Sequence, residues 1–228
     1  MKSINHTLGC IEEAERKGSM KKRILVLAPH TDDGEFGCGG TIAKLIAEQT
    51  EVFYAAFSVC ELSVPSNLPK NILEIEVKNA TSILGIRNEN LKIFHYGVRT
   101  FQSFRQQILD DLVNLRTEIQ PDLVLMPSPH DIHQDHSTIG LEGIRAFKQI
   151  SILGYELPWN NLTFHTQSFV FLKEEHLNKK IDALRCYESQ SNRVYANESF
   201  IRSLAITRGT QIGVQYAEAF EVIRWIIE

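Results

Sequence analysis

Two short polar segments of the chain contain the residue types that bind divalent metal ions. The first, His30-Thr31-Asp32-Asp33, directly follows the apolar run 24–28, and the second, PHDIHQDH at residues 129–136, follows the apolar run 123–127. Imidazole nitrogen together with carboxylate oxygen suits zinc, and a catalytic zinc keeps three protein ligands and one open position. Each segment therefore predicts part of a metal centre.

Each segment also has a simpler interpretation. A pair of aspartates before a helix is commonly an N-terminal cap, and a loop rich in histidine can simply be solvated. The glycines of segment 37–40 raise the alternative of a phosphate site, but they lack the GxGxxG spacing, and the chain contains no GxxxxGK[ST]. We expect these glycines to allow close backbone packing where a helix begins.

Alternating strand and helix patterns predict the elements that position these segments. Short apolar runs at 24–28, 52–59, 91–96 and 123–127 predict buried strands, and helical spacing follows at 41–49, 72–84, 101–119 and 137–150. This alternation predicts an α/β fold, a Rossmann-like mostly parallel sheet with helices on both faces in three layers. The two polar segments, at the ends of the first and fourth strands, then converge on one edge of the sheet.

The pattern changes after residue 150. We expect a strand at 164–172, helices at 173–187 and 198–205, and a strand or helix at 219–227. With no repeat and no linker, residues 21–228 are predicted to form a single domain. Residues 1–20 are predicted to be an N-terminal extension, in which Met20 is a candidate alternative start.

Composition restricts the partners of the chain. Its 228 residues carry a net charge of −4, which argues against a general binder of nucleic acid or of anionic membranes. No apolar run is long enough for a transmembrane helix or a signal peptide, and the four cysteines are far apart, with no CxxC pair. We therefore expect a cytoplasmic protein with a small-molecule partner.

The paired segments resemble the LmbE-like, or PIG-L, zinc-dependent N-deacetylases. That family's first motif has the form (P/A)HPDDE followed by a GCGG-type helix start, and its second motif is HxDH. The corresponding segments here are Pro29-His30-Thr31-Asp32-Asp33 with GCGG at 37–40, and His133-Gln134-Asp135-His136. The resemblance covers roughly residues 22–150, and the segment 216–226 is similar to the family's last segment.

The resemblance implies one Zn²⁺ per chain and a role for each residue of the two motifs. The implied zinc ligands are His30, Asp33 and His136. Asp32 is the implied general base for a zinc-bound water that attacks an acetamide. His133 would stabilise the oxyanion or protonate the leaving amine, and Asp135 would hydrogen-bond a histidine and fix its tautomer.

The implied substrate is an N-acetylated amino sugar or its conjugate, of the N-acetylglucosamine type. Glu61, Arg99 and Trp159 are candidate substrate-binding residues, Arg105 could join Arg99 in an anion-binding patch, and a buried structural role is an equal alternative for Trp159. The family contains both monomers and homo-oligomers, so a homo-oligomer is one expected state.

The chain departs from the family pattern at two positions, and two other classes of function are alternatives. Thr31 replaces the usual proline and Gly34 the usual glutamate, although Glu35 follows one position later. Another metal-dependent hydrolase, such as an amidase on a sugar–thiol conjugate or a phosphoesterase, is one alternative, and a non-catalytic zinc-binding domain is another. The presence of Asp32, a free base candidate, favours catalysis.

Overall fold

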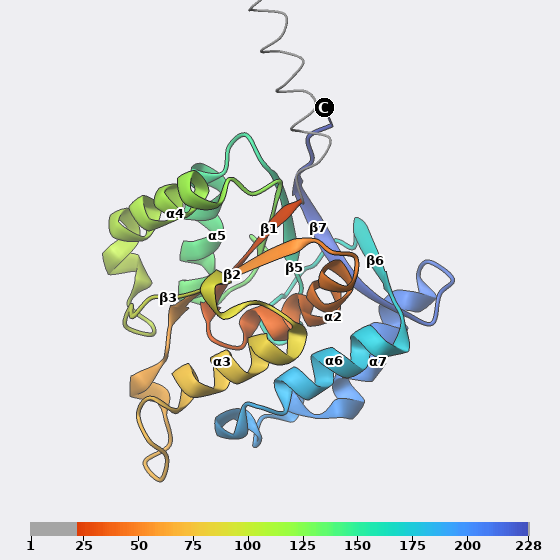
Figure 1. Cartoon of the computed structure of the whole chain (residues 1–228), viewed down its shortest axis with the longest axis horizontal. Helices are drawn as coiled ribbons and strands as arrows, with labels where there is room; N and C mark the ends of the chain where they lie inside the picture. The colour runs from red at the N-terminus through yellow and green to blue at the C-terminus, as the bar shows by residue number, and fades with distance from the viewer. Residues whose placement is uncertain (1–21, 228) are drawn as a thin grey trace, which may run out of the picture.

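The computed structural model describes residues 22–227, and the predicted extension 1–20, with Met20, lies outside the described residues. All strands of the described chain belong to one seven-stranded sheet in the order β3-β2-β1-β4-β5-β7-β6 (Figure 1). Their bounds are β1 Arg23–His30, β2 Glu51–Ser58, β3 Leu91–Ile93, β4 Leu123–Pro127, β5 Ser151–Tyr155, β6 Ser168–Leu172 and β7 Tyr216–Arg224.

The sheet is mostly parallel, which confirms the predicted fold class. Strands β1 to β5 pair in parallel, whereas β7 pairs antiparallel with both β5 and β6. The strand order runs outward from β1 through β2 on one side and from β4 through β5 on the other. Ligand sites in such sheets lie beyond the carboxyl ends of the strands where the order reverses, here at β1 and β4.

Helices cover both faces of the sheet, so the three predicted layers are confirmed (Figure 1). One face is covered by α2 Asp33–Ala47, α3 Ile72–Leu84, α6 Glu174–Leu184 and α7 Glu198–Thr210, and the other by α4 Arg105–Ile119 and α5 Gln134–Ala146. A hydrophobic core fills the space between the sheet and the helices on each face. Along β1, Ile24 and Val26 belong to the core beneath α2, α3, α6 and α7, whereas Leu25 and Leu27 belong to the core beneath α4 and α5. None of these described helices has the length and apolar character that a membrane crossing requires.

Several predicted boundaries in the sheet were wrong. The third strand ends at Ile93 rather than at residue 96, and the last segment is a strand that begins at Tyr216. Strand β5 was missed because it contains Gly154, a residue type that is rare in strands. A Cβ at Gly154 would lie 3.1 Å from Ser128 Cα, a tight contact, so glycine favours this close approach to the chain after β4.

Helix α2 begins at Asp33, eight residues before the predicted start at residue 41, so the glycine-rich segment lies inside the helix. The helix is broken at Cys38, where φ is −146°. A Cβ at Gly37 would lie 2.2 Å from the ring of Tyr155, and one at Gly40 would lie 2.5 Å from Leu172. The expected close packing is therefore present, but within the helix rather than at its entry.

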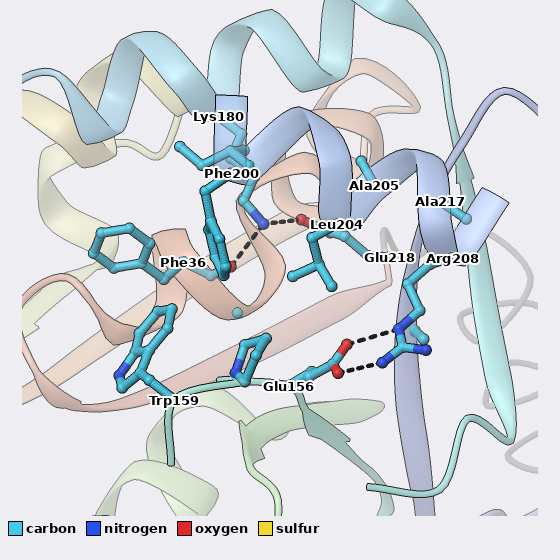
Figure 2. A pocket seen from close by; sticks show the side chains of 14 residues that line it. Phe36, Glu156, Trp159, Lys180, Phe200, Leu204, Ala205, Arg208, Ala217 and Glu218 are labelled. Carbon is cyan, nitrogen blue, oxygen red and sulfur yellow. Dashed lines mark hydrogen bonds and ion pairs between the residues drawn. The ribbon is translucent and has the colours of Figure 1, made fainter. Parts of the chain in front are cut away.

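A buried ion pair satisfies the backbone groups that this break leaves free. Lys180 Nζ donates to Phe36 O and to Glu218 Oε1, at 2.6 Å each (Figure 2). The Glu218 carboxylate accepts the backbone N–H groups of Gly40 at 3.0 Å and Thr41 at 2.7 Å. Side chains from α6 and β7 thus fix the first part of α2, which contains Asp33.

We expect that replacing Lys180 by Met destabilises the protein by about 3–5 kcal/mol, because the Glu218 carboxylate would stay buried without its cation. The free energy of unfolding in urea measures this loss. Lys179→Met, at an exposed position of the same helix, is the matched control and should change stability little. Similar small changes in both variants would show that the ion pair does not hold the broken helix.

Candidate functional site

Three predicted metal ligands meet at the carboxyl ends of β1 and β4. His30 is the last residue of β1, Asp33 is the first of α2, and His136 lies in the first turn of α5. The Oδ2 atom of Asp33 lies 3.1 Å from His30 Nδ1 and 3.1 Å from His136 Nε2, and these two nitrogens are also 3.1 Å apart. We call these three atoms the donor triangle.

The donor triangle fits a divalent ion of the zinc class. A tetrahedral ion with ligands at 2.0–2.2 Å places its donor atoms about 3.3–3.6 Å apart, close to the observed separation. The opposite ring nitrogens are already engaged, His30 Nε2 with Asp135 Oδ2 at 3.0 Å and His136 Nδ1 with Asp131 Oδ2 at 2.7 Å. Each imidazole therefore directs the lone pair of its other nitrogen into the triangle.

The electrostatics of the donor triangle favour positive charge at its centre. Burial lowers the pKa of His30, but the carboxylates of Asp33 and Asp135 outweigh it and raise that pKa to about 9. Burial likewise opposes the charged form of His136, and Asp33 and Asp131 raise its pKa to about 10. Although burial acts against it, the two histidines hold the pKa of Asp33 well below its usual value. These are the surroundings that a cation site requires.

Two carboxylates behind the triangle orient its histidines. Asp135, predicted for this role, also accepts the backbone N–H groups of Arg99 at 2.6 Å and Phe101 at 3.3 Å. Asp131 forms a hydrogen bond with His136, a role that no sequence pattern predicted. Its other oxygen accepts the backbone N–H of His133 at 2.8 Å. Its position in the histidine-rich loop, five residues before His136, was the available signal.

Asp32 differs from its neighbour Asp33. It occupies the N-cap position of α2, yet its side chain makes no capping hydrogen bond, so the capping interpretation does not apply to it. The side chain is half-buried and lines the cleft beside the donor triangle. Burial and the adjacent Asp33 charge raise the pKa of Asp32 to about 6. A carboxylate of this pKa can accept a proton near neutral pH.

His133 caps helix α5 and faces the same cleft. Its Nδ1 accepts the backbone N–H of Asp135 at 3.2 Å, so the neutral ring carries its proton on Nε2. Burial and the nearby His136 and His30 lower the pKa of His133, which favours this neutral form. One ring nitrogen from each of the three histidines lies within 4.8 Å of the others. His133 can therefore donate a hydrogen bond next to the triangle.

The donor triangle lies in a cleft of about 300 Å³. Trp159, a predicted substrate-binding residue, lines this cleft and stacks on Tyr195 with ring centroids 3.8 Å apart and an interplanar angle of 11°. Arg99, also predicted, lines it together with Arg193. Tyr195 and Arg193 come from the irregular chain before α7, where no sequence pattern indicated a role.

Other candidates lie elsewhere. Glu61 is exposed on a short 3₁₀ turn, Glu61–Ser63, and its side chain does not line the cleft, although the neighbouring Cys60 and Ser63 do. Arg105 does not join Arg99, because its Nε donates to the buried Glu142 on α5 at 2.8 Å. The cleft therefore pairs Arg99 with Arg193 rather than with Arg105.

The segment 153–161, which contains Trp159, is divided between the cleft and the core. Tyr155 is fully buried, and its hydroxyl donates to Leu27 O at 2.9 Å. Glu156 is also buried and forms an ion pair with Arg208, whose Nε lies 2.9 Å from Glu156 Oε2 (Figure 2). The cavity between this pair and Lys180 measures about 20 Å³, which is room for about one water molecule and no sugar.

Glu35 lies beneath the loop that carries the ligands rather than in the cleft. Its carboxyl group contacts the hydroxyl groups of Tyr54 and Tyr187, the latter at 3.0 Å. The same hydroxyls lie 2.9 Å and 2.8 Å from the carbonyl oxygen of Thr31. Burial raises the pKa of Glu35 to about 8, although the tyrosine hydrogen bonds act in the opposite direction. Glu35 and the two tyrosines therefore fix the turn between His30 and the helix.

Gly34, where the family carries glutamate, makes this arrangement possible. Its N–H donates to the Tyr54 hydroxyl at 3.1 Å, and a Cβ there would lie 2.5 Å from Tyr54 Cε2. The side chain of a glutamate at position 34 would therefore overlap the ring of Tyr54 where it lies in this structure. The carboxyl group of this chain enters from position 35 instead.

The sequence of this chain is similar to those of known deacetylases. The family model described as "PIG-L: GlcNAc-PI de-N-acetylase" matches residues 25–147. "Uncharacterized deacetylase YaiS" of Escherichia coli is 29% identical over 176 residues, 74% of this chain and 92% of that protein.

Solved structures of other proteins match most of the chain. The N,N'-diacetylchitobiose deacetylase from Pyrococcus horikoshii matches with a TM-score of 0.74 and 25% identity, over 89% of this chain and 84% of that one. GalB, the 4-carboxy-2-hydroxymuconate hydratase from Pseudomonas putida, has the same TM-score of 0.74 at 18% identity, over 91% and 98%. Because a deacetylase and a hydratase share this fold, the activity of this chain must be argued from its site.

We expect Gly34→Ala to destabilise the protein by about 1–3 kcal/mol, because the added Cβ overpacks against Tyr54. Displacement of Tyr54 should also loosen the ligand loop and weaken zinc binding about 10-fold, as the loss of a supporting group does. Urea unfolding and a competitive zinc titration measure the two effects.

The matched control is Gly140→Ala on α5, where the added Cβ would lie 3.8 Å from Pro127 O, an ordinary van der Waals contact. This variant should keep its zinc affinity and be no less stable, since alanine favours a helix over glycine. Equal behaviour of the two variants would mean that Tyr54 does not constrain the loop.

Proposed function

Because the chain belongs to the PIG-L family, we propose that it is a zinc-dependent hydrolase that removes the acetyl group from an N-acetylated amino sugar or its conjugate. One observation carries this proposal: the donor triangle of His30, Asp33 and His136 lies beside an acidic side chain, Asp32, that is used neither as a cap nor in the triangle. The deacetylase names of the relatives support the same reaction.

Asp32 is the proposed general base. When bound by His30, Asp33 and His136, one zinc-class ion per chain supplies a Lewis acid that acidifies water and polarises a carbonyl oxygen. Asp32 lies beside these ligands in the cleft with a pKa of about 6, so it can take the proton of the water that attacks the acetamide carbon.

His133, which lines the same cleft, is the proposed hydrogen-bond donor to the acetamide oxygen. Its Nε2–H can stabilise the negative charge that develops on the acetamide oxygen, since Nδ1 is held by the N–H of Asp135. The C–N bond then breaks, the nitrogen receives the proton that Asp32 took from the water, and the products are a free amine and acetate. Asp135 and Asp131 hold the ring orientations of His30 and His136 through this sequence.

The cleft supports a sugar as the group that carries the acetamide. The stacked pair Trp159 and Tyr195 offers an aromatic surface to a sugar ring, and Arg99 and Arg193 offer hydrogen-bond donors to hydroxyl or anionic groups. A volume of about 300 Å³ lies at the lower end of the range for small-molecule sites. The proposed partner is therefore a small N-acetylated sugar.

Other functions for this site have less support. Phosphoesterases of the two-metal class need further carboxylates at metal distance, whereas the donor triangle has one carboxylate, Asp33, and Asp135 and Asp131 are engaged by histidines. A non-catalytic zinc domain has no use for an uncommitted acid at the position of Asp32. Acetate as the product separates the proposed reaction from hydration, phosphate release and simple binding.

We expect Asp32→Asn to lower kcat for acetate release by about 10²–10⁴-fold while zinc stays bound, because only the general base is lost. His136→Ala should instead lose most of the zinc bound at the donor triangle, because one of its three ligands is removed. Metal content per chain and acetate release are measured on the same preparations.

Asp110→Asn, at an exposed position of α4, serves as the control and should change neither quantity. Full activity of Asp32→Asn would remove this residue from the base role. Undiminished acetate release after removal of all metal by a chelator would overturn the zinc mechanism.

A panel of N-acetylglucosamine derivatives, free, nucleotide-linked and aglycone-linked, should identify the preferred conjugate by acetate release. On the best substrate, Trp159→Ala should raise KM about 10-fold, equivalent to about 1.4 kcal/mol of binding, with a smaller change in kcat. Trp225→Ala, at the exposed end of the chain after β7, is the matched control and should leave KM unchanged. An unchanged KM in Trp159→Ala would exclude the aromatic pair as the sugar site.

A further inference from the structure

We propose a second metal site, separate from the donor triangle, that is formed by His130, His165 and Glu221 and takes a zinc-class dication. One donor atom from each of these residues lies within 4.8 Å of the other two. The residues come from three places in the chain: the loop between β4 and α5, the segment before β6, and β7. They were not expected together, because His165 had no neighbouring partner in the sequence.

The carboxylate of this group is already held in place. Glu221 is 4% exposed, and its two oxygens accept hydrogen bonds from the Ser128 hydroxyl and, at 2.9 Å, from the His165 backbone N–H. His130 Nε2 lies 3.8 Å from Glu221 Oε1. The rings of His130 and His165 are edge to face, with centroids 5.6 Å apart. A fixed acid therefore faces two imidazoles at the surface.

The charge balance at Glu221 favours a bound cation. A buried carboxylate is costly without a positive partner, and no Lys or Arg among residues 22–227 lies within 4.0 Å of it; the only chargeable neighbour at that distance is His130. Two histidines and one glutamate are a known zinc ligand set, and solvent can provide the fourth ligand because both histidines are exposed. Hard cations such as Mg²⁺ prefer oxygen ligands instead.

An ion at this site would connect two segments that line the cleft. Asp131, next to His130, forms a β-bridge with Asn161, and the same segment contains Trp159 and His165. A metal bond between His130 and His165 would thus join the loop of the catalytic histidines to the segment of Trp159. The expected effect is structural, namely a higher unfolding temperature of the loaded protein.

Zinc titration of the chelator-stripped full chain tests the site. The wild type should bind two equivalents of Zn²⁺, and His165→Gln should bind one and keep its acetate release. The affinity for the second ion should fall at least about 10-fold, the loss found even for groups that only support a ligand. His130→Gln should behave alike. His95→Gln, another exposed histidine outside both groups, is the matched control and should still bind two equivalents.

The two sites can fail independently. His136→Ala should keep one equivalent, at the second site, and zinc added to it should still raise the unfolding temperature; in His165→Gln the second equivalent should give no such rise. One equivalent in the wild type and none in His136→Ala would overturn the second site and leave the proposed function intact. Two equivalents in both His165→Gln and His130→Gln would overturn it as well, because the second ion would then bind elsewhere.

Discussion

Asp33 Oδ2, His30 Nδ1 and His136 Nε2 are held 3.1 Å apart from one another, and at this distance their lone pairs repel unless a proton or a cation lies between them. The surrounding structure keeps them there. Asp135 and Asp131 bind the far side of each ring, and the parallel pairing of β1 with β4 brings the two loops to one edge of the sheet. The repulsion that the fold imposes on these atoms is relieved when a divalent ion binds.

The helix that carries Asp33 shows how much of this order comes from tertiary contacts. Four glycines in its first eight residues give the segment 33–40 a weak intrinsic helix preference. Its place is fixed from outside, by Tyr54 against Gly34 and by the Lys180–Glu218 pair at the break. These contacts connect the ligand loop to β2, α6 and β7. The metal centre therefore depends on strands and helices far from it in the sequence.

Sequence reasoning succeeded where one local pattern determines the outcome. Apolar runs of the central strands are buried on both faces, so their strands and parallel order could be predicted, and the residues of the two motifs lie together in the donor triangle, where metal binding stays a prediction. Sequence reasoning failed where the deciding contact comes from a residue far away in the sequence. The first part of α2 is held by Lys180 and Glu218, strand β5 contains a glycine that packs closely against Ser128, and Arg193 reaches the cleft from an irregular segment.

The same dependence on surroundings separates two acids that are adjacent in the chain. Asp33 faces two imidazoles, which hold its pKa well below the usual value although burial acts against it. The pKa of Asp32 is raised to about 6 by burial and by the charge of Asp33 itself. An acid that binds a cation has to stay ionised, whereas an acid that accepts a proton works best with a pKa near the ambient pH. Asp33 creates both conditions, because its charge attracts the cation and at the same time raises the proton affinity of its neighbour.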